Sequence, residues 1–378
     1  MGIRLLRNVI IYRHQLFRPS EGFIVQQTKY LTQYHPVFAG RIVDGTLPNP
    51  NLDIKIIRPA GYLNLVRHVL LRDNHVLHHA LMHEKPALIH AHFGVEGVYA
   101  LPLAKKLNIP LITTFHGFDA TCSRLGLLRS KKISWLNYLA FRQQLGRDGA
   151  AFICVSNFIR DRLLRIGFPE NRLITHYIGV DTDLIKPVTQ KKAERIILHV
   201  ARLVEKKGTA YLLKAFSILQ KKGLDAKLVI IGDGPLKQEL HALATSLDIS
   251  HQVEFLGVQP PEQVIAWMQK ASLFCLPSIE ARSGDSEAMG MVLLEAAACQ
   301  IPVVATNHGG IPEGVKEGET GFLVAEKNPY ALAERLIYLL ENESLCEKMG
   351  LAAREFVERD FNLKLQTEKL EQIYQNVN

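Results

Sequence analysis

Short apolar runs alternate with longer helical patterns along almost the whole chain, and this alternation limits the fold more than any other feature. In the first half, PALIHAHF (86–93) precedes a helical pattern at 97–108, and IPLITTFHG (109–117) follows it. Strands that alternate with helices form parallel sheets with helices on both faces. We therefore expect the first half to be a doubly wound α/β domain.

A second set of alternating elements begins near residue 195. RIILHVARL (195–203) and AKLVIIGDG (226–234) are predicted strands, and the segment between them has helical periodicity. A chain of 378 residues with 47% apolar residues can bury two cores. The polar segment 179–194, which contains proline and lacks a strong period, marks the boundary. We predict one Rossmann-like domain at 1–183 and a second at 184–360.

Composition bears on the cellular compartment of the protein and on the state of its cysteines. The chain contains no apolar run of about 18 residues, and the apolar stretch near its start is too short and interrupted for a secretory signal. We therefore expect a cytoplasmic protein. The five cysteines are odd in number and scattered, which argues against a disulfide framework or a Cys-x-x-Cys metal site. We expect reduced thiols.

The net charge of +8 is unevenly distributed. Residues 1–183 contain 23 Lys and Arg against 12 Asp and Glu, whereas residues 184–378 contain 22 against 25. A basic half suggests an anionic partner such as acidic lipid headgroups, a phosphorylated substrate or nucleic acid. The same distribution also fits an ordinary solvated surface.

The segment SGDSEAMGMVLLEAAA (283–298) places Glu287 and Glu295 eight residues apart. A glycosidase pair would need carboxylates about 5 to 9.5 Å apart. Eight residues of one helix span about 12 Å, with an angular offset that points the side chains apart. The pair therefore fits better as two holders of one extended ligand, with Gly290 opening a helix whose N–H groups can receive an anion. Two surface glutamates are the alternative.

Basic side chains follow the predicted strand at 195–203. Arg202 and Lys207 lie in ARLVEKKG just beyond it, and an Arg fork with a Lys point charge suits a diphosphate. Lys206 and Lys207 are equally compatible with solvated lysines at a helix start. The chain has no Gly-x-Gly-x-x-Gly after a strand, so dinucleotide binding is disfavoured.

Histidines end two predicted strands of the first half. In TTFHGFDAT, a neutral His116 can donate to or accept from a sugar hydroxyl, and Asp119 can orient it or an acceptor hydroxyl. His90 and His92 lie in HAHF, but no third ligand is near them in the sequence, so a metal site is disfavoured.

Two glycines mark turns that can approach a ligand. Gly22 follows the predicted first strand RNVIIY and can open a helix facing a phosphate, although Ser20-Glu21 can be a plain N-cap. Gly234 lies in IIGDGPL, which brings backbone close to a ligand but is also an ordinary turn between a strand and a helix.

Taken in order, these motifs resemble the retaining nucleotide-sugar glycosyltransferases of family 4. The resemblance covers essentially the whole chain, and its segment 90–119 resembles bacterial exopolysaccharide enzymes of the colanic acid and amylovoran type. The motifs that carry it are SEGFI, HAHF, TFHGFD, IGVD (178–181), ARLVEKKG, IGDGP, FLG (255–257), LPS (276–278) and the Glu287/Glu295 pair. The resemblance implies an α/β protein of the GT-B fold, in which two Rossmann-like domains face each other across a cleft.

The resemblance also implies a role for each matching residue. Arg202 and Lys207 would bind the donor diphosphate, Glu295 the ribose hydroxyls, and Glu287 the donor sugar, with His116 against that sugar. Further donor contacts would come from Gly22, Gly234, Leu256, Gly290, Met291 and Val292, and His92 and Asp119 would lie on the acceptor side. Ala288 stands where the family usually has glycine.

Such enzymes use no protein nucleophile, no cofactor and no metal. The implied donor is a UDP- or GDP-sugar, and the implied acceptor is a glycan or a polyprenyl-diphosphate-linked glycan. We expect a basic, aromatic and leucine-rich helix at 124–147 to meet the anionic inner face of the membrane, and 361–378 to return to the N-terminal domain. A GT-B sugar-nucleotide 2-epimerase and a non-catalytic basic binding protein are the alternatives; no nucleic-acid recognition motif is present.

Overall fold

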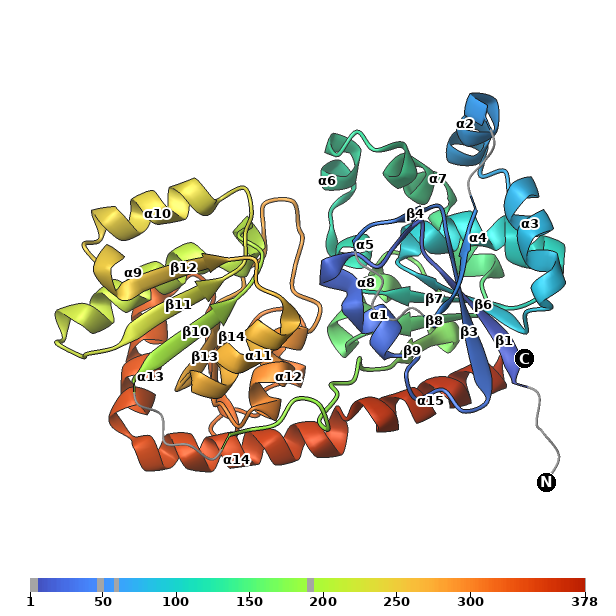
Figure 1. Cartoon of the computed structure of the whole chain (residues 1–378). Helices are drawn as coiled ribbons and strands as arrows, with labels where there is room; N and C mark the ends of the chain where they lie inside the picture. The colour runs from blue at the N-terminus through green and yellow to red at the C-terminus, as the bar shows by residue number, and fades with distance from the viewer. Residues whose placement is uncertain (1–5, 46–50, 58–60, 189–193, 378) are drawn as a thin grey trace, which may run out of the picture. The chain divides into compact units, whose positions relative to one another are not determined.

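The computed structural model describes residues 6–45, 51–57, 61–188 and 194–377. The chain divides into two compact units (Figure 1). The N-terminal unit comprises Met1–Gly179 with Leu363–Asn378, and the C-terminal unit comprises Val180–Asn362. The division after residue 179 falls inside the polar segment that marks the boundary in the sequence.

A seven-stranded sheet forms the N-terminal unit, in the order β5-β3-β1-β6-β7-β8-β9 with every pair parallel. Strands β6, β7 and β8 are buried along their whole length, as expected for parallel strands covered on both faces. The strands are β1 (Arg7–Tyr12), β3 (Tyr34–Gly40), β5 (Asp53–Ile56), β6 (Leu88–His92), β7 (Leu111–Phe115), β8 (Ala151–Cys154) and β9 (Leu173–Thr175). Two short strands, β2 (Gln15–Leu16) and β4 (Ile42–Val43), pair separately.

Helices cover this sheet on both faces (Figure 1). They are α1 (Gly22–Gln26), α2 (Gly61–Leu71), α3 (His75–Leu81), α4 (Gly94–Leu107), α5 (Phe118–Thr121), α6 (Arg124–Arg129), α7 (Ile133–Asp148), α8 (Asn157–Arg165) and α15 (Leu363–Asn376). Helix α15 joins this unit from the end of the chain. Its Tyr374 donates to or accepts from His90 Nδ1 at 2.7 Å, and its Glu371 accepts the backbone N–H groups of Thr32 and Gln33.

The segment predicted as one membrane-surface helix, 124–147, is two helices instead. Helix α6 ends at Arg129, and α7 begins at Ile133. Most of α7 packs into the unit, because its Tyr138 and Leu145 are fully buried and the Tyr138 hydroxyl donates to the backbone of Asp119 at 2.7 Å. The prediction missed the break because apolar residues on both sides of it continue the same pattern.

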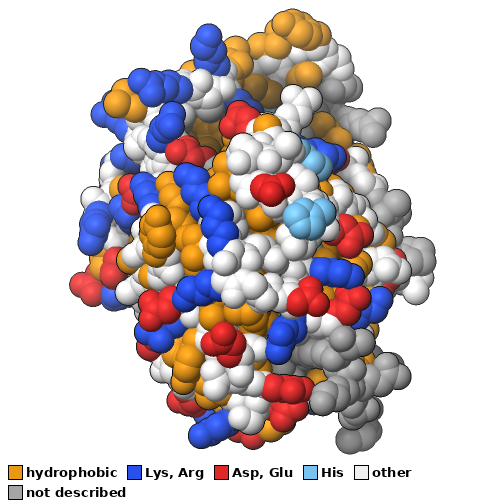
Figure 2. Space-filling view, turned by 90° about the vertical axis from the view of Figure 1, so that its left-hand side faces the viewer, with side chains coloured by type: hydrophobic (Ala, Val, Ile, Leu, Met, Phe, Trp, Pro, Cys, Tyr) orange, Lys and Arg blue, Asp and Glu red, His pale blue; other side chains and the backbone are white. Residues whose placement is uncertain are grey.

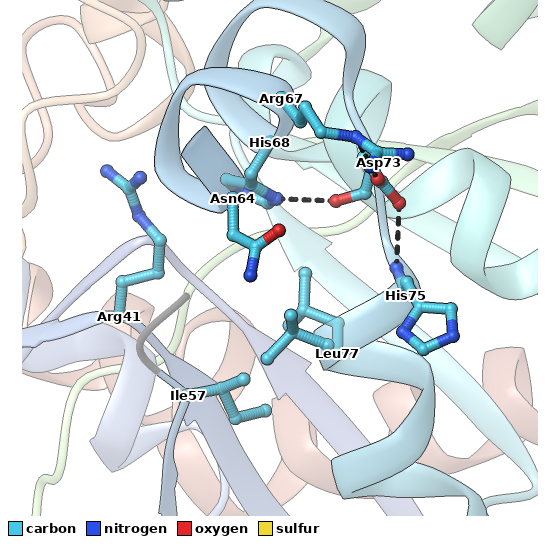
Figure 3. Close-up of a pocket in the computed structure, with 9 residues that line it drawn as sticks. Arg41, Ile57, Asn64, Arg67, His68, Asp73, His75 and Leu77 are labelled. Atoms are coloured by element: carbon cyan, nitrogen blue, oxygen red, sulfur yellow. Dashed lines mark hydrogen bonds and ion pairs between the residues drawn. The ribbon is translucent and has the colours of Figure 1, made fainter. Parts of the chain in front are cut away.

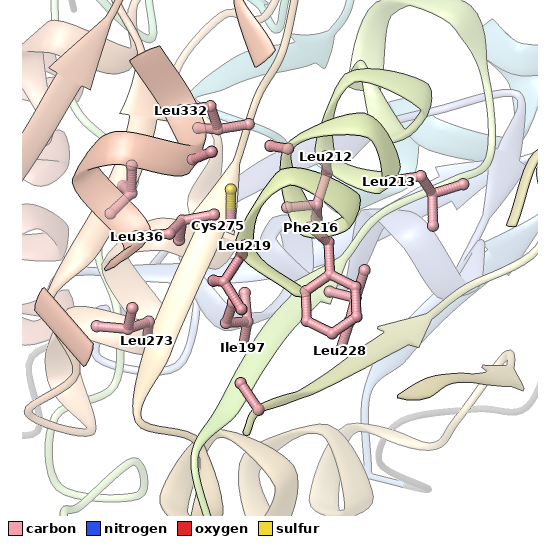
Figure 4. Packing of buried hydrophobic residues seen from close by; sticks show 14 of the residues in the cluster. Ile197, Leu212, Leu213, Phe216, Leu219, Leu228, Leu273, Cys275, Leu332 and Leu336 are labelled. Atoms are coloured by element: carbon pink, nitrogen blue, oxygen red, sulfur yellow. The ribbon is translucent and has the colours of Figure 1, made fainter. Parts of the chain in front are cut away.

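The C-terminal unit contains a six-stranded parallel sheet in the order β12-β11-β10-β13-β14-β15. Figure 4 shows its core, where Phe216 and Leu212 of one covering helix pack with Leu228 and Leu273 of the sheet. The strands are β10 (Ile196–Val200), β11 (Lys227–Ile231), β12 (Val253–Gly257), β13 (Leu273–Leu276), β14 (Val303–Thr306) and β15 (Gly321–Val324). The helices are α9 (Thr209–Lys221), α10 (Lys237–Ser246), α11 (Pro261–Lys270), α12 (Met291–Ala298), α13 (Pro329–Glu341) and α14 (Glu343–Asp360).

Each sheet has one point where the strand order reverses. In the N-terminal unit this point lies between β1 and β6, because the chain adds β3 and β5 on one side and β6 to β9 on the other. In the C-terminal unit it lies between β10 and β13 for the same reason. Ligands of open parallel sheets bind beyond the carboxyl ends of the strands at such points. These two places are where a functional site is expected.

Side chains of both charges reach the surface of the molecule (Figure 2). On the face shown in Figure 2, basic and acidic side chains are interspersed across the centre and lower part of the view. No disulfide bond joins any of the five cysteines, all of which lie within the described residues. Among the helices in the described parts of the chain, none has both the length and the apolar content that crossing a bilayer requires.

Candidate functional site

The reversal point of the C-terminal sheet carries a buried ion pair between Lys207 and Glu287. Lys207 follows β10 in a short 3-10 helix (Glu205–Lys207), and Glu287 lies in the loop after β13. Lys207 Nζ donates to Glu287 Oε2, and the two side chains are only 15% and 10% exposed. Burial would raise the pKa of Glu287, but the charges of Lys207 and Lys206 outweigh it and hold that pKa at about 2. Glu287 is therefore ionised at neutral pH.

Lys206 forms a second ion pair beside the first. Its Nζ lies 3.0 Å from Asp285 Oδ1, with side chains 20% and 18% exposed. Burial works against the charge of Lys206, but Glu287 and Asp285 together raise its pKa. Both lysines are thus paired and largely covered, so the alternative of two solvated lysines is wrong.

Glycines and a histidine fix the backbone around Glu287. Gly309 has a φ of +59°, and a Cβ there would lie 2.1 Å from the Glu287 carbonyl oxygen. Gly310 N–H donates to that oxygen at 3.0 Å, and Glu287 N–H donates to His308 Nε2 at 3.2 Å. His308 Nδ1 in turn lies 2.6 Å from Glu326. These contacts were not predicted from the sequence, although the two glycines after β14 indicate a turn there.

Helix α12 presents one open face beside this pair. Gly290, with a φ of +78°, precedes the helix, and a Cβ there would lie 3.6 Å from Glu287 Cγ. Of the helical residues 291–298, only Met291, Val292 and Glu295 are partly exposed, and the others are buried. These three share one face because positions three and four apart lie above one another. The N–H groups of a helix's first turn lack intrahelical partners, so this face can donate hydrogen bonds to an anion. One turn further along, the same face carries the carboxylate of Glu295.

Glu295 differs from Glu287 in lacking a cation. In the part of the chain that the structure describes, its carboxylate has no hydrogen-bond or ion-pair partner, and burial raises its pKa to about 7. An ionised carboxylate only accepts hydrogen bonds. Its free oxygens on the open face suit the two hydroxyls of a diol.

Arg202 completes the basic edge. Its side chain is exposed, and its charge acts on Lys206, whose pKa it lowers slightly against the neighbouring carboxylates. No carboxylate within the described ranges pairs with it. The predicted residues Arg202, Lys207, Glu287, Gly290 and Glu295 therefore lie around one edge of the C-terminal sheet.

Two further predicted donor residues, Gly234 and Leu256, lie near the carboxyl ends of β11 and β12. A Cβ at Gly234 would lie 2.5 Å from the Leu203 carbonyl oxygen, so glycine is required where the turns after β10 and β11 meet. Leu236 N–H also donates to that oxygen at 3.1 Å. Leu256 is partly exposed near the end of β12, and its carbonyl accepts from Gln259.

In the N-terminal unit, His116 lies at the end of β7 between two aromatic rings. The ring centroids of Phe23 and Phe93 are 4.9 and 4.6 Å from that of His116. His116 Nε2 hydrogen-bonds His92 Nδ1 at 3.0 Å, and its Nδ1 has no partner. Burial, together with nearby positive charge, lowers the pKa of His116 well below its usual value, so the ring is neutral. Gly22 begins α1, and a Cβ there would point into open space.

The structure places the predicted acceptor residues Asp119 and His92 at buried positions beside His116. Asp119 is 2% exposed, and its oxygens accept the N–H groups of Gly94 at 2.8 Å and Gly117 at 3.0 Å. His92 is 1% exposed and stacks on His116. Buried N–H groups need acceptors, and Asp119 supplies one to two helix starts. Both residues contact His116, His92 through its ring and Asp119 through the backbone N–H.

A charged network at the reversal point of the N-terminal sheet was missed by the sequence analysis. Arg13 follows β1 and donates to both Glu21 oxygens at 2.9 Å and to Glu96 of α4. His14 Nδ1 also binds Glu96. Burial would raise the pKa of Glu96, but His14 and Arg13 hold it at about 2. Glu21 is engaged by Arg13 and makes no side-chain cap, so the plain N-cap alternative is wrong.

Comparison with protein families and curated proteins identifies relatives of both units. The model of glycosyl transferases group 1 matches residues 181–356, and that of glycosyltransferase family 4 matches residues 34–184. The chain is 34% identical over 293 residues to the putative colanic acid biosynthesis glycosyltransferase WcaL of Escherichia coli K12, covering 75% of this chain and 69% of that protein. It is 31% identical over 290 residues to the amylovoran biosynthesis glycosyltransferase AmsK of Erwinia amylovora, covering 76% and 69%.

Solved structures share the fold at lower identity. The Anabaena protein Alr3699/HepE, crystallised with UDP and glucose, superposes with a TM-score of 0.80 at 19% identity over 98% of this chain and 100% of that one. Sucrose-phosphate synthase from Thermosynechococcus elongatus gives 0.78 at 18% identity over 98% and 99%. These likenesses confirm the predicted GT-B fold.

Proposed function

We propose that this chain, which belongs to the glycosyltransferases of group 1 and family 4, transfers a sugar from a UDP- or GDP-sugar to a glycan or lipid-linked glycan with retention of the anomeric configuration. One observation carries the proposal: Lys207, Glu287 and the open face of α12 lie together at the reversal point of the C-terminal sheet. Together they offer cations and helix N–H groups for a diphosphate, and a carboxylate that can accept hydrogen bonds from the two hydroxyls of a ribose.

The donor is expected to lie along α12. Arg202 and Lys207 meet the diphosphate together with the N–H groups after Gly290, and Glu295 accepts the ribose hydroxyls. Glu287 accepts hydroxyls of the sugar while its charge stays balanced by Lys207. A preorganised donor of this kind is worth about 3 to 4 kcal/mol when negative charge develops in the transition state. Departure of the nucleotide diphosphate is the step that these residues stabilise.

No side chain of this site is assigned as a nucleophile. The acceptor hydroxyl attacks on the face that the diphosphate leaves, and the departing phosphate oxygen takes its proton. The neutral His116 can accept from or donate to a sugar hydroxyl through its unpartnered Nδ1. We expect catalysis without a metal, so activity should survive EDTA and gain nothing from added Mg²⁺ or Mn²⁺.

The pathway assignment is exopolysaccharide biosynthesis. Two relatives above 30% identity carry the names colanic acid and amylovoran biosynthesis glycosyltransferase, and each match spans both units. The donor class is supported by the structure of HepE with UDP-glucose, although that likeness is one of fold.

A panel of nucleotide sugars tests the donor site. We expect UDP- or GDP-sugars to raise the melting temperature of the wild-type protein, and Glu287→Ala or Glu295→Ala to remove that rise. Glu239→Gln, an exposed carboxylate on α10, is the matched control and should keep it. Retention is then read from the anomeric proton coupling of the product by NMR. Conversion of the donor without an acceptor would favour the epimerase, and an inverted product would contradict the proposed stereochemistry.

We further propose that α6 and the start of α7 dock on the anionic inner face of the membrane. Leu125, Leu128, Ile133 and Leu136 are 42% to 65% exposed. Four basic side chains in the same segment are also exposed: Arg124, Arg129, Lys131 and Lys132. Apolar residues flanked by basic ones bind surfaces of anionic lipid.

Co-sedimentation with vesicles tests this docking. Arg129→Glu, Lys131→Glu and Lys132→Glu together should release the protein from vesicles containing phosphatidylglycerol. Lys186→Glu, Lys221→Glu and Lys222→Glu change the net charge equally at exposed positions of the C-terminal unit and should not. Equal release by both triple variants would reject a specific docking segment.

A further inference from the structure

The N-terminal unit contains a cavity of about 280 Å³ beyond the ends of β3 and β5 (Figure 3). Arg41, the first residue after β3, lies on one side of it, and Arg67 and His75 lie on the other. Ile57 and Leu77 supply apolar wall. The cavity lies at the carboxyl edge of the sheet, which is the edge where the site residues of this unit lie.

Arg41 brings an unneutralised charge to this cavity. Two of its guanidinium nitrogens, Nε and Nη1, are covered by the protein and have no hydrogen-bond partner. In the described ranges, no carboxylate forms an ion pair with Arg41. A covered donor without an acceptor destabilises the protein, and more so when it is charged. The protein therefore carries an energetic cost at Arg41, and an anion in the cavity that this residue lines would offset its positive charge.

The backbone holds Arg41 in place. The N–H groups of Arg41 and Ile42 both donate to the His14 carbonyl, at 3.0 and 3.1 Å. A Cβ at Gly40 would lie 2.2 Å from the Arg13 carbonyl oxygen, so the strand end and the loop after β1 are in close contact. The backbone that carries Arg41 is therefore held in place before a ligand binds.

The other charges around the cavity balance one another. Arg67 Nε lies 3.2 Å from Asp73, and the same carboxylate accepts the N–H of His75 at 3.0 Å. Burial lowers the pKa of His68 to about 4, so this ring is neutral and its Nδ1–H donates to the Asp73 carbonyl. Arg41 therefore brings the unbalanced positive charge of the cavity, and Arg67 and His75 line the opposite side (Figure 3).

Helix α2 forms one wall of the cavity and carries apolar residues on its outside. Asn64, Arg67 and His68 line the cavity, and the exposed side chains of the same helix include Tyr62 at 83%, Leu63 at 70% and Leu71 at 71%. A helix that is polar toward a cavity and apolar toward the outside suits an anionic group carried on a hydrocarbon chain.

We propose that this cavity binds a phosphate group of the acceptor, with Arg41 as its principal charge partner. A phosphate has oxygens on several sides and so matches donors that come from opposite walls, whereas a planar carboxylate matches a single fork. Such a group is carried either by a lipid phosphate or by a free sugar phosphate. That the phosphate belongs to the acceptor rests on the proposed function. Binding of phosphate to the cavity can be measured without turnover.

Binding is measured on the full chain with the donor site weakened by Arg202→Gln, which leaves the ion pair of Lys207 and Glu287 intact. The probes are inorganic phosphate, glucose 1-phosphate and dodecyl phosphate below its micellar concentration, titrated calorimetrically at constant ionic strength. Arg41→Gln should weaken binding about tenfold to hundredfold, the loss expected for one charge-assisted contact. Arg41→Lys should retain part of it, and Arg165→Gln, an exposed arginine of the same unit, should retain all of it.

The melting temperatures of the Arg41 variants give a second test. Because Arg41 is unsatisfied without an anion, Arg41→Met should melt no lower than the parent in phosphate-free buffer, and it should lose the rise in melting temperature that phosphate causes. If Arg41→Met unfolds, Asn64→Asp provides the second variant, since a carboxylate in the cavity should repel phosphate and leave Arg41 in place.

Tighter binding of dodecyl phosphate than of glucose 1-phosphate would identify a lipid source, and the reverse order a soluble one; both support the site. Phosphate affinity that is equal in the parent and in Arg41→Gln would overturn it. Failure of the proposed function would appear separately, as loss of nucleotide-sugar binding in the protein that retains Arg202 and Lys207.

Discussion

Replacing Glu287 by glutamine is expected to destabilise the C-terminal unit by about 3 kcal/mol at neutral pH. The ionised carboxylate is stabilised by Lys207 and Lys206, which hold its pKa at about 2 instead of the usual 4.5. At 1.36 kcal/mol for each unit of pKa, this difference is worth about 3 kcal/mol. Removing one member of a buried ion pair typically costs about 3 to 5 kcal/mol, which agrees.

The pH dependence of this loss has a defined sign. The pKa of Glu287 is lower in the folded than in the unfolded protein, so its stabilisation is fully present above about pH 4.5 and is lost as the pH falls from about 4.5 to 2. Between pH 5 and 8 the difference between the wild type and Glu287→Gln should therefore be constant.

Urea denaturation monitored by tryptophan fluorescence measures the difference. The chain has two tryptophans, and Trp135→Phe leaves Trp267 of α11 to report the C-terminal unit alone. The midpoint should fall in Glu287→Gln with an unchanged slope. Glu239→Gln should stay within about 0.5 kcal/mol of the parent, as surface substitutions do.

A double variant tests whether the loss comes from the ion pair. Glu287→Gln leaves the Lys207 ammonium largely covered and without its partner, so Lys207→Met in the same chain should recover part of the stability. A loss below about 0.5 kcal/mol in Glu287→Gln, or additive losses in the double variant, would refute this reasoning.

Three further outcomes are expected. Because burial raises the pKa of Glu295 to about 7, kcat/KM for the donor should fall as the pH drops through about 7, and Glu295→Gln should abolish that limb of the pH profile. Asp119→Asn should lower stability by about 1 to 3 kcal/mol in thermal melting and should leave KM for the acceptor unchanged, because both carboxylate oxygens hold backbone N–H groups. Gly208→Ala should prevent folding, since its Cβ would lie 1.8 Å from a carbonyl oxygen, whereas Gly223→Ala, also at positive φ but in open space, should cost only about 1 kcal/mol.

The fold was largely predictable because its strands are local and strongly apolar. The predicted first strand coincides with β1, and the predicted strands at 195–203 and 226–234 contain β10 and β11. Strands β3 and β5 were not predicted from the sequence. The edge strand β5 has no buried residue, and β3 contains Pro36, which weakens its strand signal. The strand order also needed the structure, since pairing of distant strands leaves no local signal.

The site residues were predictable where a charged side chain follows a predicted strand, because its charge indicates which ligand group it can bind. Lys207 and Glu287 were named from the sequence, and the structure pairs them. His308 was missed because its role is to accept the N–H of Glu287, a contact between loops of two different strands. The backbone contacts of Asp119 were not predicted, because a carboxylate that accepts backbone N–H groups has the same sequence pattern as one that faces a ligand.

A crystal structure of the chain with a nucleotide diphosphate tests the central claim most directly. We predict the diphosphate within hydrogen-bond distance of Arg202, Lys207 and the N–H groups after Gly290, with the ribose hydroxyls on Glu295. A nucleotide bound elsewhere on the C-terminal unit, with the Lys207 and Glu287 side chains still bound only to each other, would contradict the account.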